Sequence, residues 1–263
     1  MHVLVHAGFH KTGTSSIQQG LAANRAALSP ALRILLKEDM EPLTEAARAW
    51  SRRPEELEWA LVLHEARGTF SALDPDDPRP VLISSEDLCG HMPFRHGLTD
   101  YAAAAPLMAG LREALAATRP DATIAFLFTT RAAAPWVKSC YAQHLRATRI
   151  TETAEDYAAR ALPHADLGAM VDRVAAAVAP APVHSAALED IAAGPLGPLD
   201  ALLDLLPLDP ARRATLTPPA RANRALPAEV QDRLLALNRS DRPWSEVRDE
   251  KKRLVRRARR LEA

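Results

Sequence analysis

The sequence has few aromatic residues, only two cysteines and no excess of either charge. Aromatic residues make up 5% of the chain, and 33 Lys and Arg balance 33 Asp and Glu. A balanced charge argues against a protein that coats nucleic acid through a uniformly basic surface, and against an acidic disordered chain. The rest of the composition, 48% hydrophobic and 25% charged, is typical of a globular protein.

Cysteine and long apolar runs are too scarce for several protein classes. Cys89 and Cys140 form no CxxC pair and have no metal-ligand spacing to a histidine, so we expect two core thiols, no disulfide and no metal. The first residues lack the basic and apolar regions of a signal peptide. No run of about 18 apolar residues is long enough to cross a membrane. We therefore expect a cytoplasmic protein.

What the sequence does contain is an alternation of short apolar runs and longer helical patterns. Runs at 2–7, 80–85 and 122–128 are nearly all apolar, a weaker run covers 181–184, and 32–36 is either an edge strand or the end of the first helix. Helices are expected between and after them, at 15–28, 54–70, 102–118, from Pro135 onward, and at 166–178, 198–206 and 227–238. This order predicts an α/β fold with three layers (α/β/α), a short, mostly parallel sheet of about four to five strands, and a helix-rich C-terminal part. We expect one domain over 1–250, followed by a basic helical tail over 251–263.

The first expected strand runs into a glycine-bearing turn that precedes a helix. Amide groups in such a turn, together with the dipole of the helix, attract an anion. The turn supplies a mobile cation, two glycines that allow close approach, and several hydroxyl groups: Gly8-Phe9-His10-Lys11-Thr12-Gly13-Thr14-Ser15-Ser16. The alternative is a helix-capping loop that is merely rich in Ser and Thr.

This turn departs from the nucleoside-triphosphate loop GxxxxGK[ST]. Gly8 and Gly13 have the right spacing and Ser15 has the right place, but Thr14 stands where the lysine should be. Lys11 lies inside the loop instead. The pattern predicts a phosphate-like ligand that requires a lysine but no metal.

The segment from Gly8 to Ser16 resembles the 5′-phosphosulfate loop of sulfotransferases that use 3′-phosphoadenosine 5′-phosphosulfate. In that family a KTGT or KTGS motif follows the first strand. The resemblance implies a P-loop-like fold similar to that of nucleoside kinases. It also implies that Lys11, Gly8 and the residues Thr12, Gly13, Thr14, Ser15 and Ser16 hold the sulfate donor.

A second match follows the strand expected at 122–128. Arg131 and Ser139, eight positions apart and separated by a proline, match the residues that bind the donor's 3′-phosphate in the same family. An arginine at the carboxyl end of a strand suits phosphate because its planar guanidinium donates two parallel hydrogen bonds. For Arg131 alone, a surface salt bridge is the simpler interpretation.

Transfer of a sulfuryl group to an alcohol also requires a base. Glu86 follows the strand at 80–85, at the same sheet edge as the loop, and matches in position the Glu base of glycosaminoglycan-type sulfotransferases. The cytosolic small-molecule enzymes usually employ a histidine. The competing candidates are His10, His91 and His96, and Glu86 is equally compatible with capping the following helix.

Two basic segments near the C-terminus admit more than one interpretation. Arg221, Asn223 and Arg224 lie in a Pro-rich stretch and match the late basic loop that many sulfotransferases close over the nucleotide, or are simply solvated. The tail at 251–260 has seven basic residues and no acidic one. It is compatible with a solvated helix end, a weak contact with an anionic membrane surface, or attraction of an anionic partner.

Taken together, the motifs predict a sulfotransferase with Lys11 stabilising the leaving phosphate and Glu86 as the candidate base, in competition with His10, His91 and His96. The partners expected are the nucleotide donor and an acceptor that is a carbohydrate, a lipid or a small metabolite, with no nucleic acid. Two alternatives stay open: a nucleoside kinase or triphosphatase with a degenerate loop, and a nucleotide-binding module without catalysis.

Overall fold

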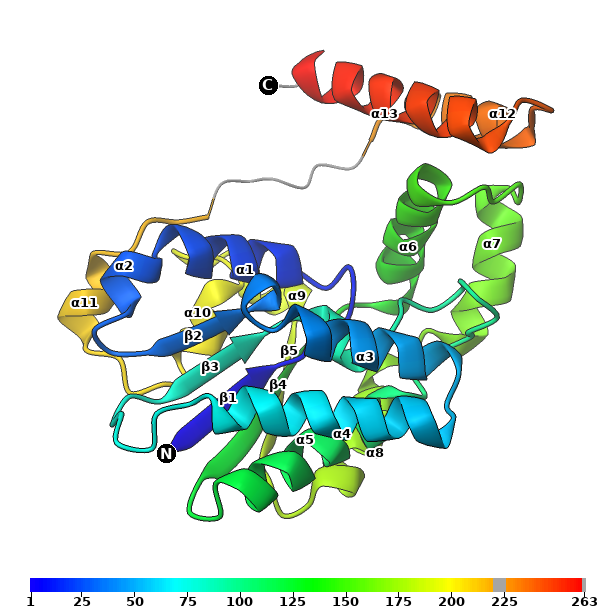
Figure 1. Ribbon diagram of the computed structural model, residues 1–263. Helices are drawn as coiled ribbons and strands as arrows, with labels where there is room; N and C mark the ends of the chain where they lie inside the picture. Colours follow the sequence, from blue (N-terminus) through cyan, green and yellow to red (C-terminus); the bar gives the residue numbers. More distant parts are fainter. Residues whose placement is uncertain (220–225, 262–263) are drawn as a thin grey trace. The chain divides into compact units, whose positions relative to one another are not determined.

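The computed structural model describes residues 1–219 and 226–261, and it divides the chain into two compact units (Figure 1). The first unit contains residues 1–132 and 166–220, and the second contains residues 133–165 and 221–263. This division differs from the single domain expected over 1–250. The helix that follows the fourth strand, α6 (Ala133–Ala147), packs against α12 (Ala228–Arg239) near the C-terminus. Contacts between segments so distant in the sequence leave no pattern in it.

Among the described residues of the first unit, five strands form one parallel sheet in the order β2-β3-β1-β4-β5. Their bounds are β1 His2–His6, β2 Arg33–Leu36, β3 Val81–Ser84, β4 Thr123–Thr130 and β5 Val183–Ala187. The predicted α/β class and its parallel sheet are confirmed. The segment at 32–36, for which two interpretations were open, is the edge strand β2.

Helices cover both faces of this sheet. The described helices of the first unit are α1 Thr14–Ala23, α2 Arg25–Leu28, α3 Glu41–Arg52, α4 Glu56–Ser71, α5 Ala104–Thr118, α8 Leu167–Val178, α9 Leu188–Ile191, α10 Leu199–Leu203 and α11 Pro210–Ala214. Short 3₁₀ turns, η1 Lys37–Asp39 and η2 Glu86–Cys89, follow β2 and β3. On one face α3, α4, α5 and α8 pack against one another, while α1, α2 and α10 lie on the other (Figure 1).

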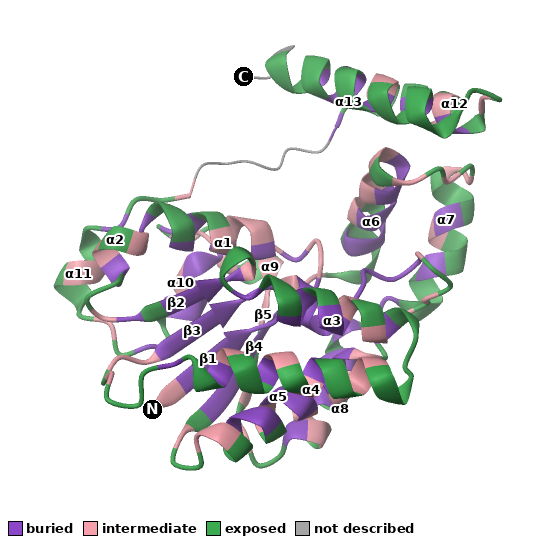
Figure 2. Ribbon diagram, in the orientation of Figure 1, coloured by how far each residue is buried: buried purple, intermediate pink, exposed green. Residues whose placement is uncertain are grey.

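The central strands β1, β3 and β4 are buried because both faces of the sheet are covered there, as Figure 2 shows. Leu4, Leu82 and Leu127 point to one face and join Ile17 and Leu21 of α1 in a continuous apolar cluster. Each of these side chains is at most 1% exposed. Complete burial of one such side chain contributes about 1.5–3 kcal/mol, so this cluster fixes α1 and the loop before it on the sheet.

The second unit is helical in all its described elements. They are α6 Ala133–Ala147, α7 Ala154–Ala161, the 3₁₀ turn η3 Leu162–His164, α12 Ala228–Arg239 and α13 Trp244–Leu261. The basic tail therefore belongs to a longer helix that starts at Trp244. Several of its cationic side chains line a cavity of about 640 Å³ together with a residue of α6: Arg146, Lys252, Arg256, Arg259 and Arg260. Contact of these side chains with an anionic membrane surface stays a prediction.

Candidate functional site

The loop between β1 and α1 holds the backbone in a conformation that most residues avoid. Three of its residues have positive φ angles: Gly8 at 57°, Lys11 at 71° and Gly13 at 100°. For a lysine this left-handed conformation is uncommon and costs free energy, so the surrounding loop must hold it in place. Such strain is typical of binding loops, because it arranges backbone amides for a ligand before the ligand arrives.

Both glycines of the loop lie where a side chain would collide with a neighbour. A Cβ atom on Gly8 would lie 2.5 Å from Cγ2 of Thr14, and one on Gly13 would lie 2.8 Å from Cδ1 of Leu188. Gly13 is the N-cap residue of α1, so no capping side chain accepts a hydrogen bond from the first amides of this helix. The first amides of a helix have no partner within the helix, so they can donate to an anion at this end.

The hydroxyl groups predicted to bind the donor fall into two sets. Thr12 is buried, and its hydroxyl donates to the carbonyl of Phe9 at 2.6 Å and pairs with the hydroxyl of Thr129 at 2.7 Å. Thr14 is 2% exposed and packs beneath Gly8. These two side chains build the loop from inside, whereas Ser15 and Ser16 are half-buried in the first turn of α1.

Arg131 follows β4 and contacts the loop directly. Its guanidinium donates to the backbone carbonyl of Lys11 at 3.3 Å and lies 3.9 Å from the carboxylate of Glu189. β1 and β4 are neighbours in the sheet, and α1 after β1 lies on the face opposite to α8, which contacts β4. This is a switch point of an open parallel sheet, where ligands bind outside the carboxyl ends of the strands.

The other predicted phosphate ligands do not belong to the described residues of the first unit. Ser139 lies on α6 in the second unit, so its pairing with Arg131 stays a prediction. Arg221, Asn223 and Arg224 lie outside the described residues.

Glu86 opens η2 directly after β3 and points toward α1. Its carboxylate accepts a hydrogen bond of 2.5 Å from the side-chain amide of Gln18. Beneath it, His6 is fully buried at the end of β1 and its Nδ1 pairs with the hydroxyl of Ser84 at 2.8 Å. Burial lowers the pKa of His6 to about 4, although the charge of Glu86 acts in the opposite direction. The imidazole of His6 is therefore neutral at pH 7.

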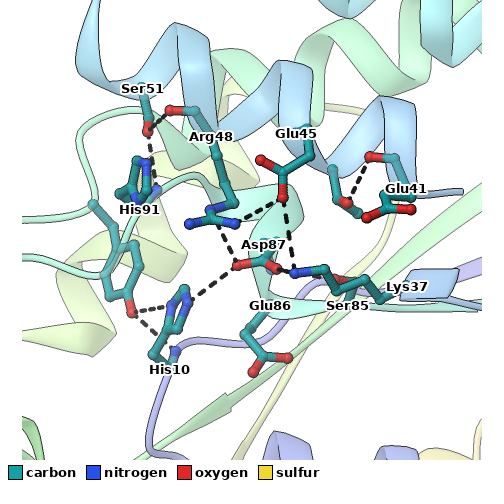
Figure 3. Close-up of polar contacts among 12 residues, drawn as sticks. His10, Lys37, Glu41, Glu45, Arg48, Ser51, Ser85, Glu86, Asp87 and His91 are labelled. Atoms are coloured by element: carbon teal, nitrogen blue, oxygen red, sulfur yellow. Dashed lines mark hydrogen bonds and ion pairs between the residues drawn. The ribbon is translucent and has the colours of Figure 1, made fainter. Parts of the chain in front are cut away.

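His10 lies in the loop beside Lys11, and its ring contacts Asp87 (Figure 3) and Tyr101. Its Nε2 lies 3.4 Å from Oδ1 of Asp87, and its Nδ1 lies 3.0 Å from the hydroxyl of Tyr101. The backbone amide of His10 donates to the same hydroxyl at 2.9 Å. In the tautomer with its proton on Nε2, the imidazole donates toward the carboxylate and Nδ1 accepts a hydrogen bond from the hydroxyl of Tyr101.

Asp87 connects the loop to two further cations. Lys37 donates to its carboxylate at 2.6 Å, and Nε of Arg48 lies 3.8 Å from it. Burial by itself raises the pKa of this carboxyl, but the hydrogen bonds and charges of His10 and Lys37 outweigh burial and hold the pKa of Asp87 well below its ordinary value. The side chain is therefore an anion next to His10 at neutral pH.

Asp87, Tyr101 and Lys37 were not predicted as site residues. Asp87 was visible in the sequence only as the neighbour of Glu86 after a strand. The two remaining histidine candidates lie beyond η2, where the rings of His91 and His96 face each other with centroids 4.8 Å apart.

Within residues 1–219 and 226–261 no group of three or more His, Cys, Asp and Glu could hold a metal ion. Nor does that part of the chain contain a helix long and apolar enough to cross a membrane. Cys89 and Cys140 are both buried, as expected of core thiols. Comparison of the chain with protein-family models, curated proteins and solved structures finds no match.

Proposed function

We propose that this protein is a sulfotransferase that transfers a sulfuryl group from 3′-phosphoadenosine 5′-phosphosulfate to a hydroxyl or amine of an acceptor. The observation that carries the proposal is the strained loop around Lys11, whose backbone carbonyl accepts a hydrogen bond from Arg131 at the end of the neighbouring strand. The KTGT sequence of the loop and its place at the switch point of the sheet support the same assignment.

Lys11 and the amides of the loop hold the 5′-phosphosulfate group, and Arg131 holds the 3′-phosphate. In the transfer, a bond forms between the acceptor oxygen and sulfur while the bond from sulfur to the phosphate oxygen breaks. Negative charge then collects on the departing 5′-phosphate, and the ammonium of Lys11 stabilises it. Adenosine 3′,5′-bisphosphate leaves, and the proton of the acceptor goes to a base of the protein.

His10 is the base that the contacts favour, and Glu86 is its rival. A carboxylate that faces one nitrogen of an imidazole fixes the tautomer and stabilises the imidazolium, as in the Asp–His pair of serine proteases. Asp87 has this relation to Nε2 of His10. Nδ1 then receives the acceptor's proton, either directly or through the hydroxyl of Tyr101. The carboxylate of Glu86 already accepts a hydrogen bond from Gln18. Among the described contacts, it has no partner that assists it as Asp87 assists His10.

Ligand binding tests the donor. Adenosine 3′,5′-bisphosphate at about a hundred times its dissociation constant should stabilise the protein by about 2.7 kcal/mol, and this stabilisation should not require magnesium. Lys11→Ala and Arg131→Ala should each abolish most of it. Arg67→Ala removes an exposed cation on α4, which lies 3.8 Å from Glu113, and should change nothing. Preference for ATP with magnesium would instead assign the loop to a kinase or triphosphatase.

Label transfer tests the reaction. Radiolabelled donor should pass its sulfur to an acceptor from a panel of carbohydrates, lipids and small metabolites. His10→Gln should lower the turnover number more than Glu86→Gln does. Tight bisphosphate binding without transfer to any acceptor would reduce the protein to a nucleotide-binding module.

A further inference from the structure

Beside the candidate base, α3 and the loop after η2 bring five basic side chains together in the first unit. Arg48 and Arg52 are four residues apart, so they lie on the same side of α3. Ser51 lies between them, and its hydroxyl accepts a hydrogen bond of 2.9 Å from the amide of His91 (Figure 3). This bond attaches the loop to the helix at the level of the two arginines.

The loop at 90–97 is tightly turned against α3. Gly90 has a φ of 85°, and a Cβ atom there would lie 2.4 Å from Cβ of Ser51. Phe94 and His96 also have positive φ angles, of 65° and 54°. The amide of Phe94 donates to the carbonyl of Leu98 at 2.7 Å, which closes the turn. The turn places the ring of His96 against that of His91.

Positive charge in this cluster exceeds the negative charge that faces it. Arg48 is paired with Glu45 at 2.8 Å and approaches Asp87. Within the described part of the chain, neither Arg52 nor Arg95 forms an ion pair. The Nε atom of Arg95 is buried without a hydrogen-bond partner, so a polar group that would normally be satisfied is left open.

The lowered pKa values of His91 and His96 reflect the same excess of positive charge. Burial lowers the pKa of His91 to about 4, and the positive charges of Arg48, His96, Arg52 and Arg95 add to the effect. Burial and the nearby arginines also lower the pKa of His96. At pH 7 the cluster therefore consists of three guanidinium groups and two neutral imidazoles, which are all able to donate hydrogen bonds to an anion.

The cluster is connected to the candidate base through one carboxylate oxygen. Oδ1 of Asp87 is 3.8 Å from Nε of Arg48 and 3.4 Å from Nε2 of His10. A group bound to Arg48 is therefore linked, through this one oxygen of Asp87, to His10, which is to take the proton of the acceptor.

We infer that Arg48, Arg52, His91, Arg95 and His96 bind an anionic group of the acceptor, so that the acceptor is an acidic molecule. A carboxylate, a sulfate or a phosphate matches the parallel donors of a guanidinium. That the bound group belongs to an acceptor rests on the proposed function, but the existence of the anion site does not. It narrows the acceptor classes to acidic carbohydrates, acidic lipids and acidic metabolites.

The first experiment measures the anion site without activity. Sodium sulfate is titrated at constant ionic strength against the Lys11→Ala, Arg131→Ala double variant, in which the donor loop has lost its cations, and stability is followed by thermal unfolding. A second titration uses the wild-type protein saturated with adenosine 3′,5′-bisphosphate. Arg52→Gln with Arg95→Gln should weaken sulfate binding by about tenfold or more in both backgrounds. Arg52→Lys with Arg95→Lys should restore most of it, and the control Arg67→Gln should have no effect.

Titrations with phosphate and acetate then identify which anion the site prefers. Equal sulfate affinity in the Gln variants and in their parents, or no saturable sulfate binding in either background, would overturn the inference. A wild-type protein that binds sulfate through Arg52 and Arg95 but does not bind the bisphosphate would overturn the proposed function alone.

The second experiment compares two acceptors that differ by one carboxylate, methyl glucoside and methyl glucuronide. Transfer to the acid should have a KM at least about tenfold lower, and the Gln variants should remove this advantage without changing bisphosphate affinity. Equal KM values for both acceptors, unchanged by the substitutions, would contradict an acidic acceptor.

Discussion

The Nε2 atom of His10 faces Oδ1 of Asp87 at 3.4 Å, although the two residues come from the loops after different strands. β1 and β3 are adjacent and parallel, so the loops that follow them leave the same edge of the sheet. The hydroxyl of Ser85 accepts a hydrogen bond of 3.3 Å from the amide of Asp87. Ser85 thereby begins the turn that directs the carboxylate of Asp87 toward the loop after β1. The pair is thus a product of strand order and of one capping residue.

Asp87→Asn tests whether this pair acts in proton transfer. The amide keeps the size of the side chain but cannot stabilise an imidazolium, so the turnover number should fall by about 10²-fold or more. The KM for the sulfate donor should stay within about twofold of the wild-type value, since Asp87 does not belong to the donor loop. Steady-state kinetics with a labelled donor measures both. A fall in the turnover number no larger than that caused by the exposed control Asp121→Asn would remove Asp87 from the mechanism.

The glycines of the loop allow a matched comparison. Gly8→Ala introduces a methyl group at positive φ and 2.5 Å from Thr14, so bisphosphate affinity should fall by about tenfold or more and unfolding should cost about 1–2 kcal/mol less. Gly68→Ala is the control, because nothing lies within 4 Å of a Cβ atom there and the residue is in α4. That variant should be more stable than the wild type by about 0.5–1 kcal/mol. Calorimetry and denaturant unfolding measure the two effects, and equal behaviour of both variants would contradict a functional role for the loop's conformation.

The sheet could be predicted because β1, β3 and β4 are buried on both faces and are therefore apolar at nearly every position. Helix ends were harder, because contacts distant in the sequence decide them. The first helix was expected to reach residue 28, but α1 ends at Ala23. Asn24 donates to the carbonyls of Gly20 and Thr217 and accepts from the amide of Thr217, so a segment nearly two hundred residues away stops the helix.

The donor loop could be predicted from the sequence, whereas the rest of the site could not. Its residues are contiguous, so the strand, the glycines and Lys11 are visible together in the sequence. The surroundings of Asp87 are assembled from His10, Lys37 and Arg48, which belong to three separate segments. No spacing rule connects such residues, and the sequence favoured Glu86, one position away, because of its place at the edge of the sheet.

His6 should make the stability of the protein depend on pH in the acidic range. Its pKa in the folded protein is about 4 against an ordinary value of 6.5, because burial disfavours the charged imidazole. Between these two values the unfolded chain binds more protons than the folded protein, so the free energy of unfolding should fall as the pH falls from 6.5 to 4. The loss should be on the order of 3 kcal/mol for this residue.

Urea unfolding of the wild type and of His6→Asn across this range isolates the contribution. The difference between their free energies of unfolding should shrink as the pH falls from 6.5 to 4. His91→Asn is the comparison, since the pKa of His91 is also lowered to about 4. A difference between wild type and His6→Asn that does not change with pH would show that the imidazole of His6 is not titrating in this way.

Lys251 should give the second unit the same sign of dependence at alkaline pH. It is 1% exposed, and its ammonium donates to the carbonyl of Thr148 and to Oδ1 of Asn238, both at 2.7 Å. Burial and the charge of Arg149 lower its pKa from 10.5 to about 8. Between pH 8 and 10.5 the unfolded chain therefore holds a proton that the folded protein has released, and the stability contributed by this residue should rise with pH. Lys251→Met has no titrating group at this position, so the free energy of unfolding of the wild type minus that of the variant should increase from pH 8 to 10.5. A difference that stays constant, or that decreases, would mean that the buried ammonium keeps its proton throughout and that its two hydrogen bonds compensate for its burial.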